Sequence, residues 1–473
     1  MDAGDGRGAG MSGREDAASD LSDGVDAFAD LMREPPNPPA DGEWADDPRR
    51  RRARRRRGWI IAAVLLLVLV GAPVTYTAWA LNAPVAAPVG TMSTPQAAAA
   101  APVALTLPAE GATAISVSGG EAYLGDTAAG IWAATGGDDP RPIASITKLV
   151  TAMVILDAIP LAGSDDPGPT ITFTKADHDL YDEYYVQGAT IAPMPTGSTL
   201  SLHDALATML IPSASNYADA VSRWVFGSQG AFVDAARAWL DEQGLTGTTI
   251  VEPTGLSPDN TSRPSELIAI GRLAAANPVI SRIASTGTLA LQGPGFMVNT
   301  NSLLGREGVT GLKTGTFGLG SYNLLFTASL DVGIGAPLQV TGIRMGGATR
   351  DSTNADVIAL LSSIRSGFHD IPVSAAGQEI GAFTTAWGAS ATLVLRDAAS
   401  VLTWSDTPIV ASLSTTAPVT FRDGEEVGVM TWTAGPNTAT SVVEVEGEIE
   451  PPTEWWRLTH PSELGLPWDP PPG

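Results

Sequence analysis

Hydrophobic residues along the chain form four patterns, and each predicts a different kind of element. Residues 59–81 carry no charge, and a run of about 20 apolar residues can cross a bilayer as a helix. Residues 145–158 place apolar side chains on most faces of a helix, which predicts a buried helix. Residues 309–316 and 322–330 read as two strands joined by a glycine-rich turn. From residue 371 onward, short alternating runs with turn signals about every ten positions predict a small β-sandwich.

Arginines flank the long apolar run on one side only. Eight of the nine residues 49–57 are arginine, so the positive-inside rule places the N-terminus in the cytoplasm and the remainder of the chain outside. The sequence therefore predicts a cell-membrane protein with a single span. A cleaved signal peptide is the alternative, because AWA at 78–80 resembles a cleavage site. A 58-residue leader is long for a signal peptide, and both interpretations export everything after residue 82.

Composition divides the rest of the chain. Residues 1–48 hold three Arg and thirteen Asp or Glu with few large apolar side chains, which predicts disorder. Residues 83–104 are uncharged and rich in Ala and Pro, which predicts a semi-extended spacer. The C-terminal stretch is too rich in proline for an amphipathic membrane helix, and Trp455 and Trp456 are expected to pack on the β domain. The expected organisation is an acidic tail ending in the Arg-rich run at 1–58, a transmembrane helix at 59–81, a linker at 82–107, a main domain at 108–370, a β-sandwich at 371–450 and a proline-rich tail at 451–473.

Charge and composition exclude several classes of function. The net charge is −24, or −22 for the part after residue 82, which argues against a nucleic-acid partner. The chain has no cysteine, so it has neither disulfides nor a thiol nucleophile. None of the four histidines has metal-ligand spacing, and neither a metal nor another cofactor is expected. Those histidines are His178, His203, His369 and His460.

The chemistry is expected at the start of the 145–158 helix. Ser145 and Lys148 are three residues apart, so they share one face of the first turn, and Pro142 discourages helix before the serine. A desolvated lysine can act as the base for a serine nucleophile without any histidine. On its own this spacing is weak, because an N-cap serine with a solvated lysine has the same pattern. Lysine is rare here, however, with three in 473 residues.

A second lysine lies in the sequence Lys313-Thr314-Gly315, in the predicted strand 309–316. The strand setting predicts that Gly315 leaves room for a substrate backbone to approach. Lys313 is predicted to be a fixed positive charge that attracts a substrate carboxylate. The same charge is expected to depress the pKa of Lys148 by like-charge repulsion.

Residues 108–370 resemble the serine-type D-alanyl-D-alanine carboxypeptidases, the low-molecular-mass penicillin-binding proteins. The resemblance is carried by RPIASITKLVTAMVILD at the nucleophile, by the segment 197–224 around IPSASNYADA, by GLTGTTIVEPTGLSPDN, and by NTNSLLGREGVTGLKTGT. It implies a mixed α/β (α+β) fold of the penicillin-binding, β-lactamase-like type, with an antiparallel sheet and flanking helices. The small β-sandwich and the N-terminal helix complete the expected architecture.

The resemblance also implies roles for individual residues. Ser145 is expected to be the acylated nucleophile, Lys148 its general base and Ser213 a proton relay. The substrate carboxylate is expected at Lys313 and Thr314, beside Gly315. The backbone N–H groups of Ser145 and Thr316 are expected to form the oxyanion hole.

One departure concerns the middle motif, which in this family is Ser, any residue, Asn. The chain has Ser213-Ala214-Ser215, with Asn216 one place late. Either Ser215 replaces the asparagine, or the loop shifts and Asn216 serves. A hydroxyl reaches less far than an amide, so activity or specificity is expected to change.

The implied function is removal of the terminal D-alanine from peptidoglycan stem peptides through an acyl-enzyme, with β-lactams as inhibitors that acylate the same serine. The catalytic domain is expected to lie outside the cytoplasm, held to the membrane by the N-terminal helix. The alternatives are a β-lactamase or endopeptidase on the same scaffold, and a catalytically impaired wall-binding or regulatory homologue.

Overall fold

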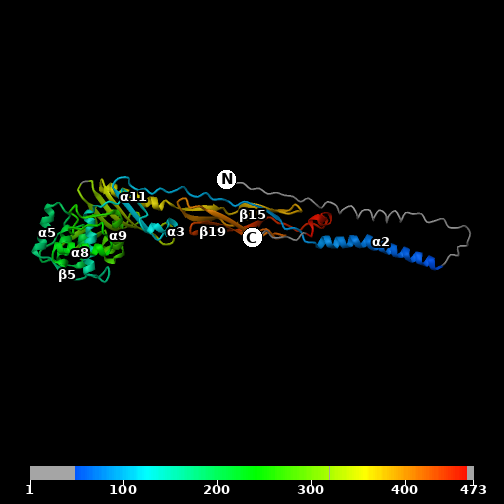
Figure 1. The fold of residues 1–473 in the computed structure, drawn as a ribbon, viewed down its shortest axis with the longest axis horizontal. Helices are drawn as coiled ribbons and strands as arrows, with labels where there is room; N and C mark the ends of the chain where they lie inside the picture. The colour runs from blue at the N-terminus through cyan, green and yellow to red at the C-terminus, as the bar shows by residue number, and fades with distance from the viewer. Residues whose placement is uncertain (1–47, 319, 466–473) are drawn as a thin grey trace, which may run out of the picture. The chain divides into compact units, whose positions relative to one another are not determined.

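The computed structural model describes residues 48–318 and 320–465, and the chain divides into two units, Met1–Ala83 and Pro84–Gly473. In the first unit, helix α2 (Pro48–Asn82) contains the predicted apolar run (Figure 1). Residues 52–82 of α2 have a mean hydropathy of 2.4 in their apolar window and form a candidate membrane span. The expected disorder of residues 1–48 falls, apart from Pro48, outside the described residues.

The main domain in the second unit is built on a five-stranded antiparallel sheet. Its order is β10 (Val309–Thr316), β11 (Tyr322–Leu330), β12 (Leu338–Gly347), β2 (Ala112–Ser118) and β3 (Ala133–Thr135). Strands β10 and β11 have the predicted bounds, and they are joined by the predicted hairpin. β10 forms one edge of the sheet, and this edge carries the Lys-Thr-Gly sequence.

Helices cover both faces of this sheet, as the alternation of side chains along its strands requires. On one face, Leu325 and Ile343 share a core with Ile268 of α9 (Pro264–Ala276). On the other, Phe326 packs in a separate core with Leu361 of α11 (Arg350–Arg365). The domain is therefore the mixed α/β arrangement that the sequence predicts.

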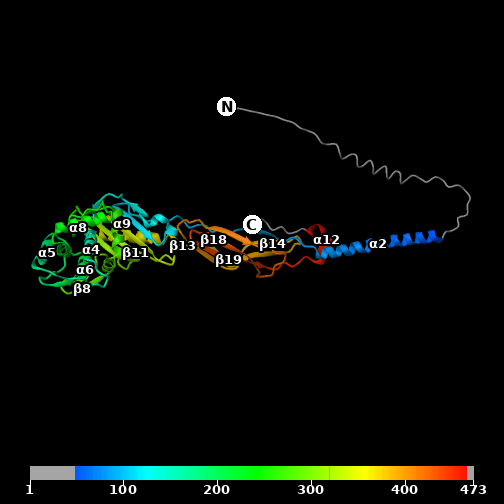
Figure 2. The same ribbon diagram turned by 60° about the horizontal axis from the view of Figure 1, so that its bottom comes forward.

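Helix α4 (Thr147–Ala158) lies at the centre of the larger core, among α6 (Leu202–Leu210), α7 (Ser215–Phe226), α8 (Gln229–Glu242) and α9 (Figure 2). Ten of its twelve residues are buried, which agrees with the predicted buried helix. The other elements of the domain are α3 (Glu121–Leu124), η1 (Asp126–Ala129), β4 (Arg141–Pro142), η2 (Ala144–Ile146), β5 (Thr170–Thr172), α5 (Lys175–Val186), β6 (Thr199–Ser201), β7 (Thr261–Ser262), α10 (Pro278–Ala284), β8 (Thr288–Leu291) and β9 (Gly295–Val298).

The C-terminal region forms the expected β domain. A six-stranded sheet and a two-stranded ribbon enclose a core that contains Trp432 and the stacked rings of Phe383 and Phe421. The sheet has the order β1 (Val89–Met92), β14 (Gln378–Thr384), β15 (Ser390–Leu395), β19 (Asn437–Glu446), β18 (Glu426–Ala434) and β17 (Val410–Thr415), and the ribbon pairs β13 (Phe368–Ser374) with β16 (Ala399–Trp404).

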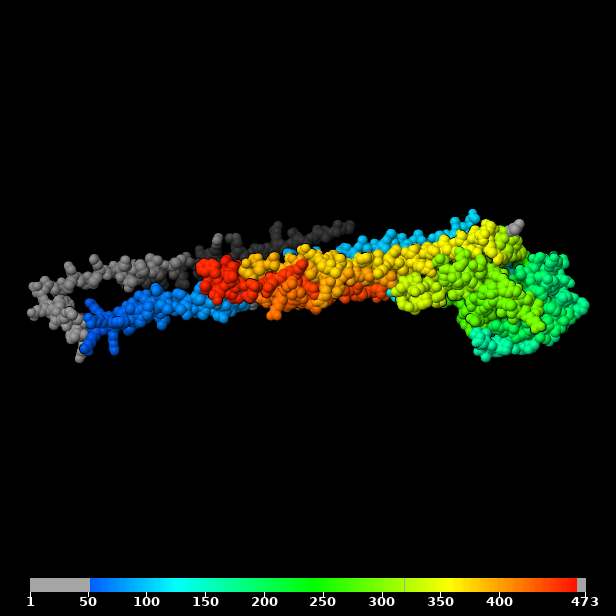
Figure 3. Space-filling view, turned by 180° about the vertical axis from the view of Figure 1, so that it is seen from behind, coloured from blue at the N-terminus to red at the C-terminus, as the bar shows by residue number. Residues whose placement is uncertain are grey.

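The Ala/Pro-rich segment differs from the predicted spacer. Its residues 89–92 form strand β1, which pairs with β14 at the edge of the sheet. Farther along, Val103 N donates to Ser405 Oγ, and Thr106 N donates to Ser363 Oγ of α11. Figure 3 shows the cyan segment running along the yellow and orange surface of this region. The segment therefore joins the two domains of the unit along its length instead of standing free.

In its described residues 451–465, the proline-rich tail contains one short helix, α12 (Glu454–Thr459), followed by η3 (Pro461–Glu463). The two tryptophans of α12 behave differently. Trp456 packs against Trp387 of the β domain, as expected, with ring centroids 5.9 Å apart. Trp455 is 75% exposed and does not pack as expected.

Candidate active site

The turn that carries Ser145 is fixed from both sides. Before it, Pro142 in β4 is paired with Thr261 in β7, so the chain is extended up to this point. Ala144 then takes a left-handed conformation, with φ of 51°, and η2 leads directly into α4. The predicted start of the helix at the serine is confirmed. Ser145 is half-buried, and its side chain faces the cleft described below.

Lys148 contacts the serine directly. Its Nζ lies 3.1 Å from Ser145 Oγ and donates to the carbonyl oxygen of Thr254 at 2.6 Å. The side chain is fully buried, and this burial lowers the pKa of Lys148 to about 7, against a smaller opposing effect of Glu252. At neutral pH, a substantial fraction of the amine is thus uncharged and able to accept a proton.

Lys313 reaches the same region from β10. It is buried, and its Nζ lies 3.4 Å from the carbonyl oxygen of Thr314. Burial, followed by the charges of Lys148 and Arg350, holds the pKa of Lys313 well below its usual range. The sequence predicted that the charge of Lys313 depresses the pKa of Lys148. The pKa of Lys148 is depressed, but the charge of Lys313 is not the cause. Burial is what lowers the pKa of Lys148, because it removes the amine from water.

Gly315 lies where β10 packs against the nucleophile turn. A Cβ atom there would lie 2.6 Å from the carbonyl oxygen of Ile143 and 3.3 Å from Ala144 Cβ. The missing side chain thus allows β10 to pack against the nucleophile turn. This close approach is between two parts of the protein, and the predicted approach of a substrate backbone to Gly315 stays a prediction.

The middle motif lies at the start of α7. Ser213 has a left-handed conformation, with φ of 71°, and its buried Oγ has no hydrogen-bond partner within the described residues. Ser215 lines the same cleft as Ser213 and Ser145. Asn216 does not line it, because its Oδ1 accepts from Ala192 N at 3.1 Å and its Nδ2 donates to Ala192 O at 2.8 Å. The residue available on the cleft is therefore Ser215.

These residues surround a cleft of about 570 Å³. The predicted residues on its wall are Ser145, Ser213, Ser215, Thr314 and Thr316. Sequence analysis missed the other contributors, which are Gln187, Gly188, Ala189, Thr190, Gly255, Leu256, Thr300, Phe317, Gly318, Tyr322 and Arg350.

Arg350 is the charged residue on the cleft wall. It is exposed at the first position of α11, and its Nη1 donates to Thr300 O at 3.0 Å. Thr314 Oγ1 donates to Thr300 Oγ1 at 2.7 Å, so the two hydroxyls lie together near the guanidinium. A cation beside two hydroxyls suits a carboxylate. In the sequence, an arginine at this position alone indicates no site.

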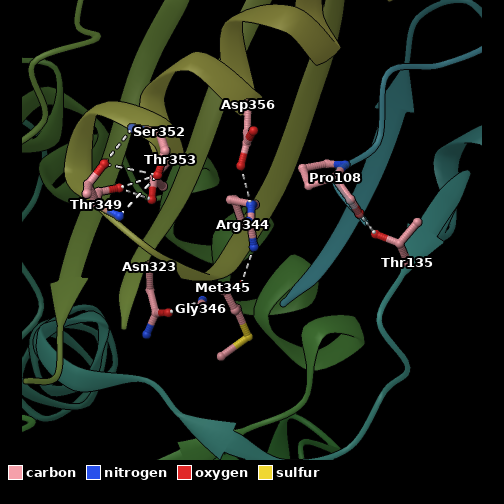
Figure 4. Close-up of polar contacts among 10 residues, drawn as sticks. All are labelled: Pro108, Thr135, Asn323, Arg344, Met345, Gly346, Thr349, Ser352, Thr353 and Asp356. Atoms are coloured by element: carbon pink, nitrogen blue, oxygen red, sulfur yellow. Dashed lines mark hydrogen bonds and ion pairs between the residues drawn. The ribbon is translucent and has the colours of Figure 1, made fainter. Parts of the chain in front are cut away.

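The turn before α11 is held by buried polar side chains (Figure 4). Asn323 on β11 accepts from Gly346 N at 3.0 Å and donates to Pro142 O at 3.1 Å. Arg344 is buried between Asp356, at 2.8 Å, and the carbonyl oxygen of Met345. Through Asn323, the sheet holds the strand before Ser145 and the turn before Arg350 at a fixed separation.

Comparison with known proteins finds a family that part of this domain matches. Residues 109–335 match the family described as D-alanyl-D-alanine carboxypeptidase, Peptidase_S11. The family resemblance predicted for residues 108–370 is thus confirmed over this segment. The arrangement predicted with it, an antiparallel sheet with flanking helices, is also confirmed.

Curated relatives match part of the chain. The D-alanyl-D-alanine endopeptidase of Pseudomonas aeruginosa is 33% identical over 173 residues, which cover 35% of this chain and 52% of the relative. The D-alanyl-D-alanine endopeptidase of Haemophilus influenzae is 29% identical over 194 residues, covering 40% of this chain and 63% of the relative. The chain thus spans between half and two thirds of the length of these relatives.

Among solved structures, penicillin binding protein 5 from Haemophilus influenzae aligns with a TM-score of 0.48 and 18% identity. The alignment covers 74% of this chain and 99% of that one. Penicillin binding protein 6B from Escherichia coli aligns with a TM-score of 0.48 and 20% identity, covering 71% of this chain and 96% of that one.

Proposed function

We propose that this chain is a serine DD-peptidase that acts through an acyl-enzyme on Ser145. The observation that carries the proposal is the contact of 3.1 Å between Lys148 Nζ and Ser145 Oγ, combined with a pKa of about 7 for that buried amine. Serine is a poor nucleophile without a base, and a neutral lysine at hydrogen-bond distance supplies one. The family of residues 109–335 supports the same chemistry.

The proposed reaction has two steps. Ser145 Oγ attacks the scissile carbonyl carbon while Lys148 accepts its proton. The C–N bond then breaks, and the proton passes to the leaving amine. The relay is the hydroxyl of Ser213, which has no partner in the described part of the chain. The backbone N–H groups of Ser145 and Thr316 are the proposed oxyanion hole. In the second step, water hydrolyses the ester and restores Ser145.

The cleft supports a substrate with a free terminal carboxylate. We propose that Arg350 and the hydroxyls of Thr314 and Thr300, which lie on the same cleft as Ser145, bind such a group. Lys313, buried behind Thr314, is the proposed second source of positive charge when it binds a proton on arrival of the anion. We propose on this basis a carboxypeptidase that removes the terminal D-alanine of peptidoglycan stem peptides and binds β-lactams.

An endopeptidase that cleaves cross-links is the second candidate. The observation that favours it is that the curated relatives described above are named D-alanyl-D-alanine endopeptidases. A β-lactamase and an impaired wall-binding homologue remain alternatives on the same scaffold, the latter because Ser215 stands where the family has asparagine.

The proposed location is the cell membrane, with the active site outside the cytoplasm. Helix α2 supports it, since it is long and apolar enough to span a bilayer and arginines precede its apolar part. Two measurements test this topology. The full chain is expected to stay in the membrane fraction after alkaline extraction, and its N-terminal tail is expected to be protected from protease in right-side-out vesicles.

The activity is tested by mass spectrometry of the intact full-length chain in detergent after incubation with benzylpenicillin. The expected result is one penicilloyl adduct on the wild type and none on Ser145→Ala. A wild type without an adduct would contradict the proposed catalysis. Adduct lifetime distinguishes a β-lactamase, which turns the adduct over rapidly. Product analysis with a pentapeptide ending in D-Ala-D-Ala and with a cross-linked muropeptide dimer separates carboxypeptidase from endopeptidase activity.

A further inference from the structure

The loop that follows Glu252 is organised around this one carboxylate. Its Oε1 accepts from Gly255 N at 2.7 Å, Ser257 N at 3.2 Å and Asn260 Nδ2 at 2.6 Å. Its Oε2 accepts from the backbone N and from Oγ1 of Thr254, at 2.7 and 2.6 Å. Five donors thus converge on the two oxygens. Such an arrangement needs an ionised carboxylate, because an amide would present N–H groups to some of these donors.

The same loop contacts Lys148 and the backbone just before Ser145. Thr254 O accepts from Lys148 Nζ at 2.6 Å, and Asn260 O accepts from Ile143 N, two residues before the serine, at 3.0 Å. Gly255 packs so closely that a Cβ atom would lie 2.0 Å from Ala144 O. The loop therefore fixes where the amine lies relative to the nucleophile turn.

We propose that Glu252 is a positioning residue for the general base: its carboxylate holds the 252–260 loop so that Thr254 presents its carbonyl oxygen to Lys148. The proposal rests on the proposed function, because it assigns Lys148 as the base. Glu252 is not on the wall of the cleft, and its oxygens are occupied by the loop. It therefore acts through Lys148 and not on the substrate.

The charge of Glu252 adds a second effect on Lys148. Burial lowers the pKa of this amine, and the carboxylate opposes that effect. From the neighbouring strand, Lys313 faces the same amine, and Arg350 in turn acts on Lys313. Removal of the negative charge is expected to lower the pKa of Lys148 further, so that the amine becomes a weaker base.

Glu266 offers a matched control. It is also half-buried, and its carboxylate also holds a loop, through Gly247 N at 2.7 Å and Thr248 Oγ1 at 2.6 Å. Its partners make no contact with Lys148. Glu252→Gln and Glu266→Gln therefore disturb comparable loops, of which only one touches the base.

The experiment uses the full-length chain in detergent, labelled with ¹³C at lysine Cε. With three lysines in the chain, and Lys175 on the surface as a reference, the Lys148 signal can be followed through a pH titration. We expect Glu252→Gln to move the Lys148 midpoint to lower pH by roughly half a unit or more, and Glu266→Gln to leave it unchanged. An unchanged midpoint in Glu252→Gln, or an equal shift in both variants, would overturn the electrostatic effect.

Positioning is tested separately by the rate of penicillin acylation at pH 9, where Lys148 is neutral in every variant. We expect a loss of roughly tenfold or more in Glu252→Gln and little change in Glu266→Gln. Glu252→Asp keeps the charge but has a shorter side chain. Its Lys148 titration midpoint is therefore expected to match the wild type, while its acylation rate falls. This variant replaces Glu252→Gln if Glu252→Gln does not fold. Equal rates in Glu252 and Glu266 variants would overturn the positioning role. A wild type that is never acylated contradicts the proposed function instead, and the titration still decides the electrostatic effect.

Discussion

The side-chain amide of Asn216 forms two hydrogen bonds with the backbone of Ala192, one to its N–H and one to its carbonyl oxygen. The neighbouring residues of α7 hold the same loop, because Ser215 N donates to Thr190 O and Tyr217 Oη donates to Pro193 O. This loop supplies residues 187–190 to the cleft wall. Asn216, one of the two residues that the sequence offered for the place beside the substrate, thus holds the loop behind the cleft wall.

We therefore predict that substitutions at these two adjacent residues affect different properties, stability for Asn216 and the acylation rate for Ser215. Asn216→Ala removes both bonds and leaves a buried N–H and carbonyl of Ala192 without partners, which costs about 2–4 kcal/mol of unfolding free energy. Ser215→Ala retains these bonds, so it is expected to cost less than about 1 kcal/mol and to act mainly on the acylation rate. Thermal denaturation together with penicillin labelling of both variants separates the effects. A stable Asn216→Ala variant would show that the loop is held by other contacts.

The parts of the site that are close in sequence could be predicted, because local geometry determines them. Ser145 and Lys148 are one helical turn apart, and the β10–β11 hairpin has its own turn signal. Arg350 and Glu252 could not be predicted, since nothing near them in the sequence indicates that Arg350 shares a cleft with Ser145 or that the 252–260 loop contacts the nucleophile turn.

Conformation and partners distant in sequence explain the remaining differences. The sequence left open whether Ser215 or Asn216 takes the place of the family's asparagine. The left-handed φ of Ser213 turns the start of α7 so that the side-chain amide of Asn216 faces Ala192. Strand β1 was missed because its residues are a strand only through pairing with β14, almost 300 positions later.

Gly255 tests how tightly the loop must pack against the nucleophile turn. Gly255→Ala introduces left-handed strain at φ of 83° and a contact of 2.0 Å with Ala144 O, so we expect the turn to move and acylation to fall by about tenfold or more. Gly227→Ala has the same φ of 83° at the end of α7, but its Cβ meets nothing within 4 Å. It is expected to lose stability by about 1–2 kcal/mol with acylation unchanged. Equal acylation rates for both variants would contradict the packing requirement.

The pH dependence follows from the neutral base. Acylation requires unprotonated Lys148, so its rate is expected to rise with pH through a midpoint of about 7 and then reach a plateau. Stopped-flow acylation by a chromogenic cephalosporin between pH 5 and 9 measures this curve. A flat profile across this range would show that the amine is not the base in the rate-determining step.

The same burial reduces stability. Because the pKa of Lys148 is 10.5 in the unfolded chain and about 7 in the folded one, folding releases a proton between these values, and stability rises with pH across that interval. Moving the Lys148 amine out of water costs free energy of folding, up to roughly 5 kcal/mol at pH 7 and below and nothing above pH 10.5. Lys148→Met removes this cost. We expect an inactive variant that melts at a higher temperature than the wild type, with a smaller difference at pH 10. A lower melting temperature at pH 7 would indicate that the bonds of Lys148 outweigh its desolvation.

The proposed carboxylate site is tested at Arg350. If the guanidinium binds the terminal carboxylate, Arg350→Gln raises KM about 10- to 100-fold for a peptide ending in D-Ala-D-Ala, because a charge-assisted contact is lost. The same substitution is expected to leave KM nearly unchanged for the peptide with an amidated terminus. Arg365→Gln is the matched control, since this arginine ends the same helix, pairs with Glu307 at 2.5 Å and does not line the cleft. The decisive quantity is the ratio of kcat/KM for the acid to that for the amide. It should fall in Arg350→Gln alone, and an unchanged ratio would assign carboxylate binding to Lys313 and the two threonines without the arginine.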